Sequence, residues 1–299
     1  MDLKIFIEKF CTGLNENLST NFDPEIYLAF NQDVKMAGAD PLWHYNNFGL
    51  KERRVNQFTR HNLINMLPRS ASYLEIGPLG RPYLSKKEFN IKYFDVLNRN
   101  DLINKAKEAE GHHPEDVPEI DFVDANGDLS FINEKFDIVF SSHCIEHQPN
   151  ILGHLQQVSR LIKGTGLYIC IIPDFRYSFD HFRAPSNIVE VIKAFVDNRK
   201  VHTRENLLLS TYMATHNDPC KHWAGDHGSC NLNKVDIARI LKSLSIQSMN
   251  YEDAHAWFFS PNNFREVFDT EVNELTAMRL VLCHDTPINT HEFVAIFMP

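Results

Sequence analysis

A glycine turn followed by an acid is the part of this sequence with the clearest chemical meaning. The apolar segment Tyr73–Ile76 predicts a short strand that runs into the turn Gly77-Pro78-Leu79-Gly80. A second predicted strand, Ile91–Phe94, ends on Asp95. Glycines let a ligand come close to the backbone, and an acid at the end of the next strand can accept hydrogen bonds from both hydroxyls of a ribose. This order predicts a site for a ligand that contains a nucleoside.

The spacing of the turn narrows the choice of ligand. It is not the G-x-G-x-x-G of dinucleotide sites, because the third glycine is missing and Glu75 stands before the turn. We therefore expect a cofactor without a pyrophosphate, and S-adenosylmethionine fits that description. The alternative is an ordinary tight turn between two strands, since short glycine turns are common in such connections.

A second set of reactive side chains gathers in residues 215–230. The segment holds His216, Asp218, Cys220, His222, Asp226, His227 and Cys230. Imidazole and carboxylate groups are suitable ligands for a divalent metal, although the spacing matches no zinc motif. Three interpretations stay open: a metal site, a lid with His222 or His227 as a base and with Gly225 and Gly228 as hinges, or a purely structural segment.

Composition limits the class of protein. The chain has 299 residues, a net charge of −9 and six cysteines, none of them in a CxxC pair. An acidic chain disfavours nucleic acid as the main partner, and scattered cysteines are typical of a reducing compartment. No apolar run reaches the length of a membrane span, and the first residues do not resemble a secretory signal. We expect a cytoplasmic protein with no nucleic-acid partner and no membrane span.

The elements that position these groups form an alternating series from residue 59 onward. Strands are predicted at 73–76, 91–95, 120–123, 136–141, 167–172, 246–250 and 291–298, with a further edge strand near 255–259. Helices are predicted at 59–67, 150–162, 187–199, 233–244 and 262–268, and 105–118 is expected to be a loop or a frayed helix. Such alternation predicts an α/β fold, a mostly parallel sheet with helices on both faces, over residues 59–299.

Residues 1–58 predict a small helical module. Asp23-Pro24 and Asp40-Pro41 are typical helix starts, and Gly49 is a plausible helix end. We expect a compact aromatic core from Tyr27, Trp43, Tyr45 and Phe48.

The helical module resembles one found in bacterial proteins of surface-polysaccharide synthesis, often beside glycosyltransferases. The matched residues are Phe22-Asp23, Tyr27-Leu28, Asn31, Asp33-Val34, Asp40-Pro41-Leu42, His44-Tyr45 and Phe48-Gly49. The resemblance implies a pathway context, with glycosyltransferases of that pathway as partners, and no particular chemistry.

Five segments in order resemble the class I S-adenosylmethionine-dependent methyltransferases over residues 59–175. They are L-E-I-G-P-L-G, Y-F-D, I-D-F-V-D-A-N-G-D-L, F-D-I-V-F-S-S-H-C-I-E-H-Q-P-N and V-S-R-L-I-K-G-T-G-L-Y-I-C-I-I-P-D. The resemblance implies a Rossmann-like fold with a seven-stranded sheet. The segments 173–183 and 253–264 also resemble a bacterial subgroup associated with polysaccharide gene sets, and residues 175–232 would be an insertion on the acceptor side.

The resemblance also implies roles for individual residues. Glu75, Gly77, Pro78 and Gly80 match the motif beside the methionine part of the cofactor, and Asp95 matches the acid that binds the ribose. Asp124 and Ala125 match the pair near the adenine, and Ser142 and His143 match the strand end beside the sulfonium. The chain departs from the family at Pro78-Leu79, where G-P-L-G replaces G-x-G-x-G, which puts the placement of the methionine carboxylate in question.

Methyl transfer to an oxygen requires an in-line acceptor, exclusion of water, and a base or a metal for the hydroxyl proton. His143 is the first candidate base, and its alternative is packing or capping of the next turn. Glu146-His147 is expected to close that turn, while His255 and Trp257 face the same cleft or simply the core. After the fifth strand, further acceptor-side candidates are Asp174, Arg176, Asp180, His181 and Arg183, joined by Asp226 from the later segment. The alternative for these is a salt-bridged surface loop.

The function expected from this resemblance is O-methylation of a sugar hydroxyl in bacterial surface-glycan synthesis. Two alternatives stay open. One is a methyltransferase that acts on another small molecule, and the other is a non-catalytic binding module of a glycan assembly. Asp95 and Asp124 disfavour the binding module, whereas the altered G-P-L-G turn favours it.

Overall fold

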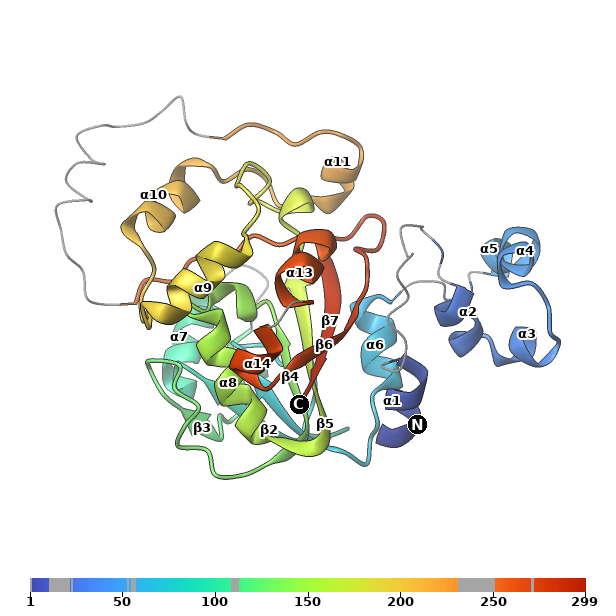
Figure 1. Ribbon diagram of the computed structural model, residues 1–299, viewed down its shortest axis with the longest axis horizontal. Helices are drawn as coiled ribbons and strands as arrows, with labels where there is room; N and C mark the ends of the chain where they lie inside the picture. Colours follow the sequence, from blue (N-terminus) through green and yellow to red (C-terminus); the bar gives the residue numbers. More distant parts are fainter. Residues whose placement is uncertain are drawn as a thin grey trace.

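A seven-stranded sheet organises the protein in the computed structural model (Figure 1). The structure describes residues 2–10, 22, 24–52, 54, 58–108, 113–230, 251–269 and 272–299. The strands are β1 (Ser72–Ile76), β2 (Asn90–Asp95), β3 (Phe122–Val123), β4 (Phe136–Ser142), β5 (Ile162–Pro173), β6 (Arg279–Cys283) and β7 (Glu292–Met298). Their order is β3-β2-β1-β4-β5-β7-β6.

The sheet is parallel from β3 to β5, and β7 pairs antiparallel with both β5 and β6. This confirms the predicted fold class, a mostly parallel seven-stranded α/β sheet. The strand order reverses between β1 and β4, and in such folds ligands usually bind at the carboxyl edge of the sheet at this point. Because β7 runs in the opposite direction, it begins at this same edge.

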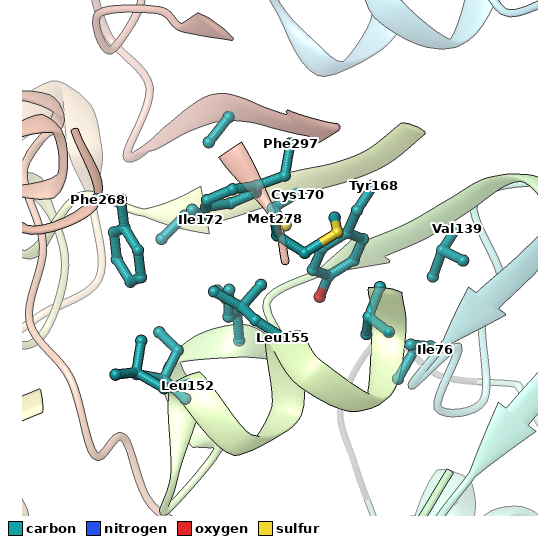
Figure 2. Close-up of a cluster of buried hydrophobic side chains, with 14 of the residues drawn as sticks. Ile76, Val139, Leu152, Leu155, Tyr168, Cys170, Ile172, Phe268, Met278 and Phe297 are labelled. Atoms are coloured by element: carbon teal, nitrogen blue, oxygen red, sulfur yellow. The ribbon is translucent and has the colours of Figure 1, made fainter. Parts of the chain in front are cut away.

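Each face of the sheet has its own buried cluster of apolar side chains, because successive strand residues point to opposite faces. Leu152 and Leu155 of α8 (Ile151–Leu161) pack on the face that carries Val139 and Tyr168 (Figure 2). The helices α13 (Pro261–Phe268) and α14 (Val272–Thr276) lie on that face too. The opposite face packs against α1 (Leu3–Phe10) and α6 (Arg60–Met66).

Central strands are buried on both faces, which explains their unbroken apolar sequences. All residues from 166 to 173 in β5 are buried. The helix α8 begins where Asn150 accepts a hydrogen bond from the Gly153 N–H, a cap that typically contributes about 1 kcal/mol. This cap fixes the residues between β4 and α8 at the carboxyl edge.

Four helices lie beyond the carboxyl edge, beside α8 or beside β2. The helix α7 (Arg99–Glu108) follows β2, and α9 (Ile188–Val196), α10 (Arg204–Tyr212) and α11 (Pro219–Trp223) follow β5. Short turns of 3₁₀ helix are Pro114–Asp116, Ile145–His147 and Phe175–Tyr177. The helices α10 and α11 lie above the end of the sheet, whereas α9 lies beside α8 (Figure 1) and buries Val191 and Ala194 in the same apolar cluster. Within the described residues, none of the helices has the length and apolar character to cross a bilayer.

The N-terminal helices α2 (Pro24–Phe30), α3 (Gln32–Met36), α4 (Pro41–His44) and α5 (Leu50–Glu52) extend to one side of the sheet (Figure 1). Asp40 caps α4 by accepting from the Trp43 N–H, as predicted. Gly49 does not end a helix, because the π-helical turn Tyr45–Gly49 continues directly into α5. The predicted aromatic core is partly wrong. Tyr27 and Tyr45 pack with Phe22, but Trp43 and Phe48 are 55% and 45% exposed.

Other predictions of elements need correction. No strand forms at 255–259, where Phe259 makes a single bridge to Asp174. The helix α7 covers part of the stretch expected to be a loop or frayed helix, and β6 was not predicted. The predicted helix 233–244 and strand 246–250, and the predicted cap residue Asp23, lie outside the described residues.

Candidate active site

The carboxyl edge of the sheet brings together the residues that follow four parallel strands. Gly77 follows β1, Asp95 ends β2, His143 follows β4 and Asp174 follows β5. The sequence predicted all four as site residues. The structure therefore places them along one edge, as the parallel arrangement requires.

The turn after β1 needs glycine at its first position. Gly77 has a φ of +69°, a conformation in which a side chain is strained, and its N–H donates to the Phe94 carbonyl at 2.9 Å. Leu79 also has a positive φ, +52°, and its N–H donates to Asp95 Oδ2 at 3.1 Å. The turn therefore accommodates Pro78-Leu79, the residues that differ from the family pattern, and is held to Asp95 by the Leu79 N–H.

Glu75 braces the chain beyond the turn. Its carboxylate is 1% exposed and accepts from the N–H groups of Tyr83 and Leu84, at 2.9 and 3.2 Å. Burial raises the pKa of Glu75 to about 8. Gly80 lies between Glu75 and the residues that its carboxylate binds, Tyr83 and Leu84. The role of Glu75 beside the methionine part of the cofactor stays a prediction.

Asp95 has the capacity to bind a ribose. It is 2% exposed, and burial raises its pKa. Its two oxygens accept one N–H each, from Leu79 and from Leu97 at 3.0 Å. An ionised carboxylate offers about four acceptor positions, so about two remain for the two ribose hydroxyls. The residue present therefore fits the predicted cofactor.

Two other features agree with a nucleoside cofactor at this edge. The Asp124 N–H donates to the Asp95 carbonyl, which places Asp124 and the exposed Ala125 beside Asp95. Asp124 Oδ1 accepts from the N–H groups of Asn126 and Asp128. The hydroxyl of Ser142 is buried and has no hydrogen-bond partner among the described residues. An unpaired buried hydroxyl at a strand end is expected where a ligand supplies the partner.

His143 lies at the end of β4 in a strained conformation, with a φ of +50°. Its Nε2 lies 2.8 Å from Glu292 Oε2 at the start of β7, and Glu292 also pairs with Arg60 of α6. Burial alone would raise the pKa of Glu292, but the hydrogen bond from His143 and the charge of Arg60 hold it below its usual value. The ionised Glu292 therefore accepts from His143 Nε2–H, which leaves a lone pair on Nδ1.

Glu292 was not predicted from the sequence. Its only signal is an acid at the second position of the predicted strand 291–298. The antiparallel direction of β7, which places that position at the carboxyl edge beside Pro173, supplies the missing information.

Glu146 occupies the centre of a group of histidines. Its side chain is 0% exposed, and neither carboxylate oxygen has a hydrogen-bond partner among the described residues. Three ring nitrogens face Oε1: His143 Nδ1 at 3.9 Å, His147 Nε2 at 3.8 Å and His255 Nε2 at 3.9 Å. Glu146 and His147 thus do more than close the turn after β4.

Two further carboxylates hold these rings from behind. His255 Nδ1 lies 2.5 Å from Asp180 Oδ2, and His147 Nδ1 lies 2.9 Å from Asp253 Oδ1. Burial would lower the pKa of His255, but the hydrogen bond to Asp180 and the charges nearby raise it. His255 was expected to face either the cleft or the core. The structure places its ring beside Glu146, in the turn that follows β4.

The predicted acceptor-side residues after β5 mainly contact one another. Asp174 is fully buried and binds Arg176 and the Thr286 hydroxyl. Arg183 donates to Asn206 Oδ1 at 2.6 Å and stacks on Phe258, while its Nη1 has no partner among the described residues. Their binding of an acceptor stays a prediction.

Three predicted histidines form a separate stack. The rings of His181 and His227 lie 3.7 Å apart and nearly parallel, and His222 Nδ1 lies 3.0 Å from His227 Nδ1. Burial lowers the pKa of both His222 and His227. Asp226 Oδ1 accepts from the Gly228 N–H at 3.1 Å. The structure thus joins His181 to residues 215–230.

Comparison with known proteins agrees with this geometry. Residues 80–170 match the family model of a methyltransferase domain. No curated protein matches the chain. Among solved structures, the CcbJ methyltransferase from Streptomyces caelestis is similar, with 12% identity and a TM-score of 0.39 over 77% of this chain and 89% of that one.

A second similar structure is an S-adenosylmethionine-dependent methyltransferase from Clostridium acetobutylicum. It has 11% identity and a TM-score of 0.38 over 91% of this chain and 97% of that one. Both likenesses are too distant to carry conclusions about function. The family match includes Asp95, Asp124 and His143, and together with the order of the sheet it shows a Rossmann-like methyltransferase domain whose cofactor is S-adenosylmethionine.

Proposed function

We propose that the protein methylates a hydroxyl group of a sugar during bacterial surface-glycan synthesis. The observation that carries the proposal is the His143–Glu292 pair, at the same edge of the sheet as Asp95. A histidine whose second nitrogen is held by a carboxylate is a suitable general base near neutral pH. Transfer to an oxygen needs such a base, because a sugar hydroxyl does not ionise near neutral pH.

The reaction balances with these residues. Bound S-adenosylmethionine supplies an electrophilic methyl group on a sulfonium. The acceptor oxygen forms a bond to the methyl carbon, the carbon–sulfur bond breaks, and its electron pair stays on sulfur, which leaves S-adenosylhomocysteine. His143 Nδ1 takes the hydroxyl proton, and Glu292 stabilises the resulting imidazolium through the hydrogen bond to Nε2.

The acceptor class is proposed from the segments that lie above the carboxyl edge. Arg183 Nη1 has no partner among the described residues, and Asp226 is exposed, so both have free capacity for hydroxyl groups. Glycan acceptors carry many hydroxyls, which suits such donors and acceptors. The resemblance of the N-terminal helices supports the pathway, with glycosyltransferases of that pathway as partners and the cytoplasm as location.

Calorimetric titration with S-adenosylhomocysteine, followed by a turnover assay, tests the proposal. The assay measures S-adenosylhomocysteine released from S-adenosylmethionine with a panel of nucleotide sugars and free monosaccharides. We expect micromolar binding and turnover with at least one sugar. Binding with turnover only on non-sugar small molecules would overturn the acceptor class. Absence of binding would overturn methyl transfer and favour a non-catalytic binding module.

A further inference from the structure

We propose that Glu146, His147 and His255 form a binding site for one divalent transition-metal ion. The ligand atoms are one carboxylate oxygen of Glu146 and the Nε2 atoms of the two histidines, all within 4.8 Å of one another. Binding of the ion does not depend on methyl transfer, whereas its part in the reaction rests on the proposed function.

The first argument is the isolation of the Glu146 carboxylate. It is 0% exposed, and both oxygens are without a hydrogen-bond partner among the described residues. Burying a carboxylate with no hydrogen bonds is very unfavourable, so such groups are normally paired or coordinate a metal. The three surrounding ring nitrogens stand at 3.8 to 3.9 Å, too far for hydrogen bonds.

The second argument is the orientation of the two histidines. Asp180 hydrogen-bonds to His255 Nδ1, whereas Asp253 lies 2.9 Å from His147 Nδ1 without forming a hydrogen bond. In both rings Nε2 faces the same oxygen of Glu146. Metal-binding histidines typically have this arrangement, because a carboxylate behind the ring fixes its orientation and strengthens the ligand nitrogen.

The third argument is the size of the gap. Bonds from zinc to imidazole nitrogen or carboxylate oxygen are about 2.0 to 2.2 Å, so two ligand atoms of a tetrahedral ion stand about 3.3 to 3.6 Å apart. The oxygen-to-nitrogen separations of 3.8 and 3.9 Å exceed this spacing by a few tenths of an ångström. One ion can therefore contact Glu146 and both histidines after small movements of the side chains.

The donor set selects the type of ion. Two imidazoles and one carboxylate suit zinc and similar transition metals, whereas magnesium and calcium prefer sites made of oxygen. Three protein ligands leave a coordination position open. His143 Nδ1 faces the same Glu146 oxygen at 3.9 Å. An acceptor hydroxyl at the open position would lose its proton more easily, and His143 is placed to take it.

The two other groups of clustered ligands have less need of an ion. His222 Nε2–H donates to the His216 carbonyl, so His222 Nδ1 accepts from His227 Nδ1–H, and both ring nitrogens of His222 already have hydrogen-bond partners. In the group of His143, His291 and Glu292, the carboxylate already binds His143 and Arg60. Glu146 has no such partner among the described residues.

Titration of metal-free protein with Co²⁺ tests the site, because cobalt bound to nitrogen ligands gives a visible absorption spectrum. We expect the full-length protein to bind about one ion per chain, as three protein ligands with an open position imply. Glu146→Gln and His255→Gln should lose the spectrum, and His222→Gln, the matched control from the other histidine group, should keep it. A wild-type protein that binds no cobalt would overturn the proposal, as would loss of the spectrum in His222→Gln alone.

A further variant tests the site even if the substitutions of buried residues prevent folding. The Asp253 side chain is 57% exposed, so Asp253→Asn should leave the fold intact. It removes the carboxylate behind His147 and should weaken cobalt binding about 10- to 100-fold. Unchanged affinity in a folded Asp253→Asn variant would contradict the assigned orientation of His147. Titration with S-adenosylhomocysteine is a separate measurement, so failure of the metal site and failure of the proposed function can be told apart.

Discussion

His143 Nε2 lies 2.8 Å from Glu292 Oε2, which joins the end of a parallel strand to the start of the antiparallel strand β7. The same carboxylate pairs with Arg60 from α6. Glu292 is a positioning residue, because it acts on the proposed acceptor only through His143. Its charge holds the histidine in one tautomer and stabilises the proton that the histidine gains.

Glu292→Gln tests this relationship. The variant keeps a side chain of nearly the same size but loses the charge, so we expect kcat to fall by about 100-fold or more. The affinity for S-adenosylhomocysteine and the KM for the acceptor should stay unchanged, which a merely structural effect would not produce. Glu134→Gln, at an exposed carboxylate that pairs with Lys92, is the control and should keep its turnover. Equal kcat in Glu292→Gln and wild type would contradict the role of His143 as the base.

Asp95→Asn should weaken binding of the cofactor. Its carboxylate has about two acceptor positions left after its contacts with Leu79 and Leu97, and the ribose hydroxyls are expected to fill them. Hydrogen bonds to a charged group contribute about 1.5 to 3 kcal/mol, so we expect the dissociation constant of S-adenosylhomocysteine to rise roughly 10- to 100-fold. The stabilisation of the protein by this ligand should shrink accordingly in a thermal melt. Undiminished affinity would show that the ribose binds elsewhere.

The sequence predicted the parts of the site that depend on local order. Gly77, Asp95 and His143 each follow a parallel strand, and parallel strands of one sheet share a carboxyl edge. Their relative positions therefore follow from the fold class alone. The apolar pattern predicted β1, β2 and β4 to within one residue at each end, whereas β5 begins five residues before the predicted strand 167–172.

The remaining parts depend on contacts between distant segments. Glu292 reaches the edge only because β7 is antiparallel, and the Asp180–His255 pair joins residues 75 positions apart. The apolar run at 255–259 was predicted as a strand, but Trp257 and Phe259 are buried by packing against the sheet helices instead. A buried segment without strand structure can have the same run of apolar residues as a buried strand, and sequence periodicity does not distinguish the two.

Gly77→Ala tests the strain in the turn after β1. The added Cβ would meet Cys144 Sγ at 3.4 Å, an ordinary contact, so the positive φ of +69° is the main cost. That conformation costs a non-glycine residue about 1 to 2 kcal/mol, and we expect this decrease in the free energy of unfolding by urea denaturation. Gly164→Ala is the matched control, because Gly164 has open space around it. Similar losses in both variants would contradict the assignment of strain to Gly77.

Glu75 should make stability depend on pH. Burial raises its pKa to about 8, so between about pH 4.5 and pH 8 the folded state binds more protons than the unfolded state. Stability contributed by the protonated group is fully present below the unfolded pKa and is lost as the pH rises through the folded pKa. The loss is up to about 1.4 kcal/mol per pH unit, a few kcal/mol in all. Urea denaturation of wild type at pH 5.5 and pH 8 should show this fall, and Glu75→Gln should show a clearly smaller one. Equal pH dependence in the two proteins would show that Glu75 keeps its charge in the folded state, held by the N–H groups of Tyr83 and Leu84.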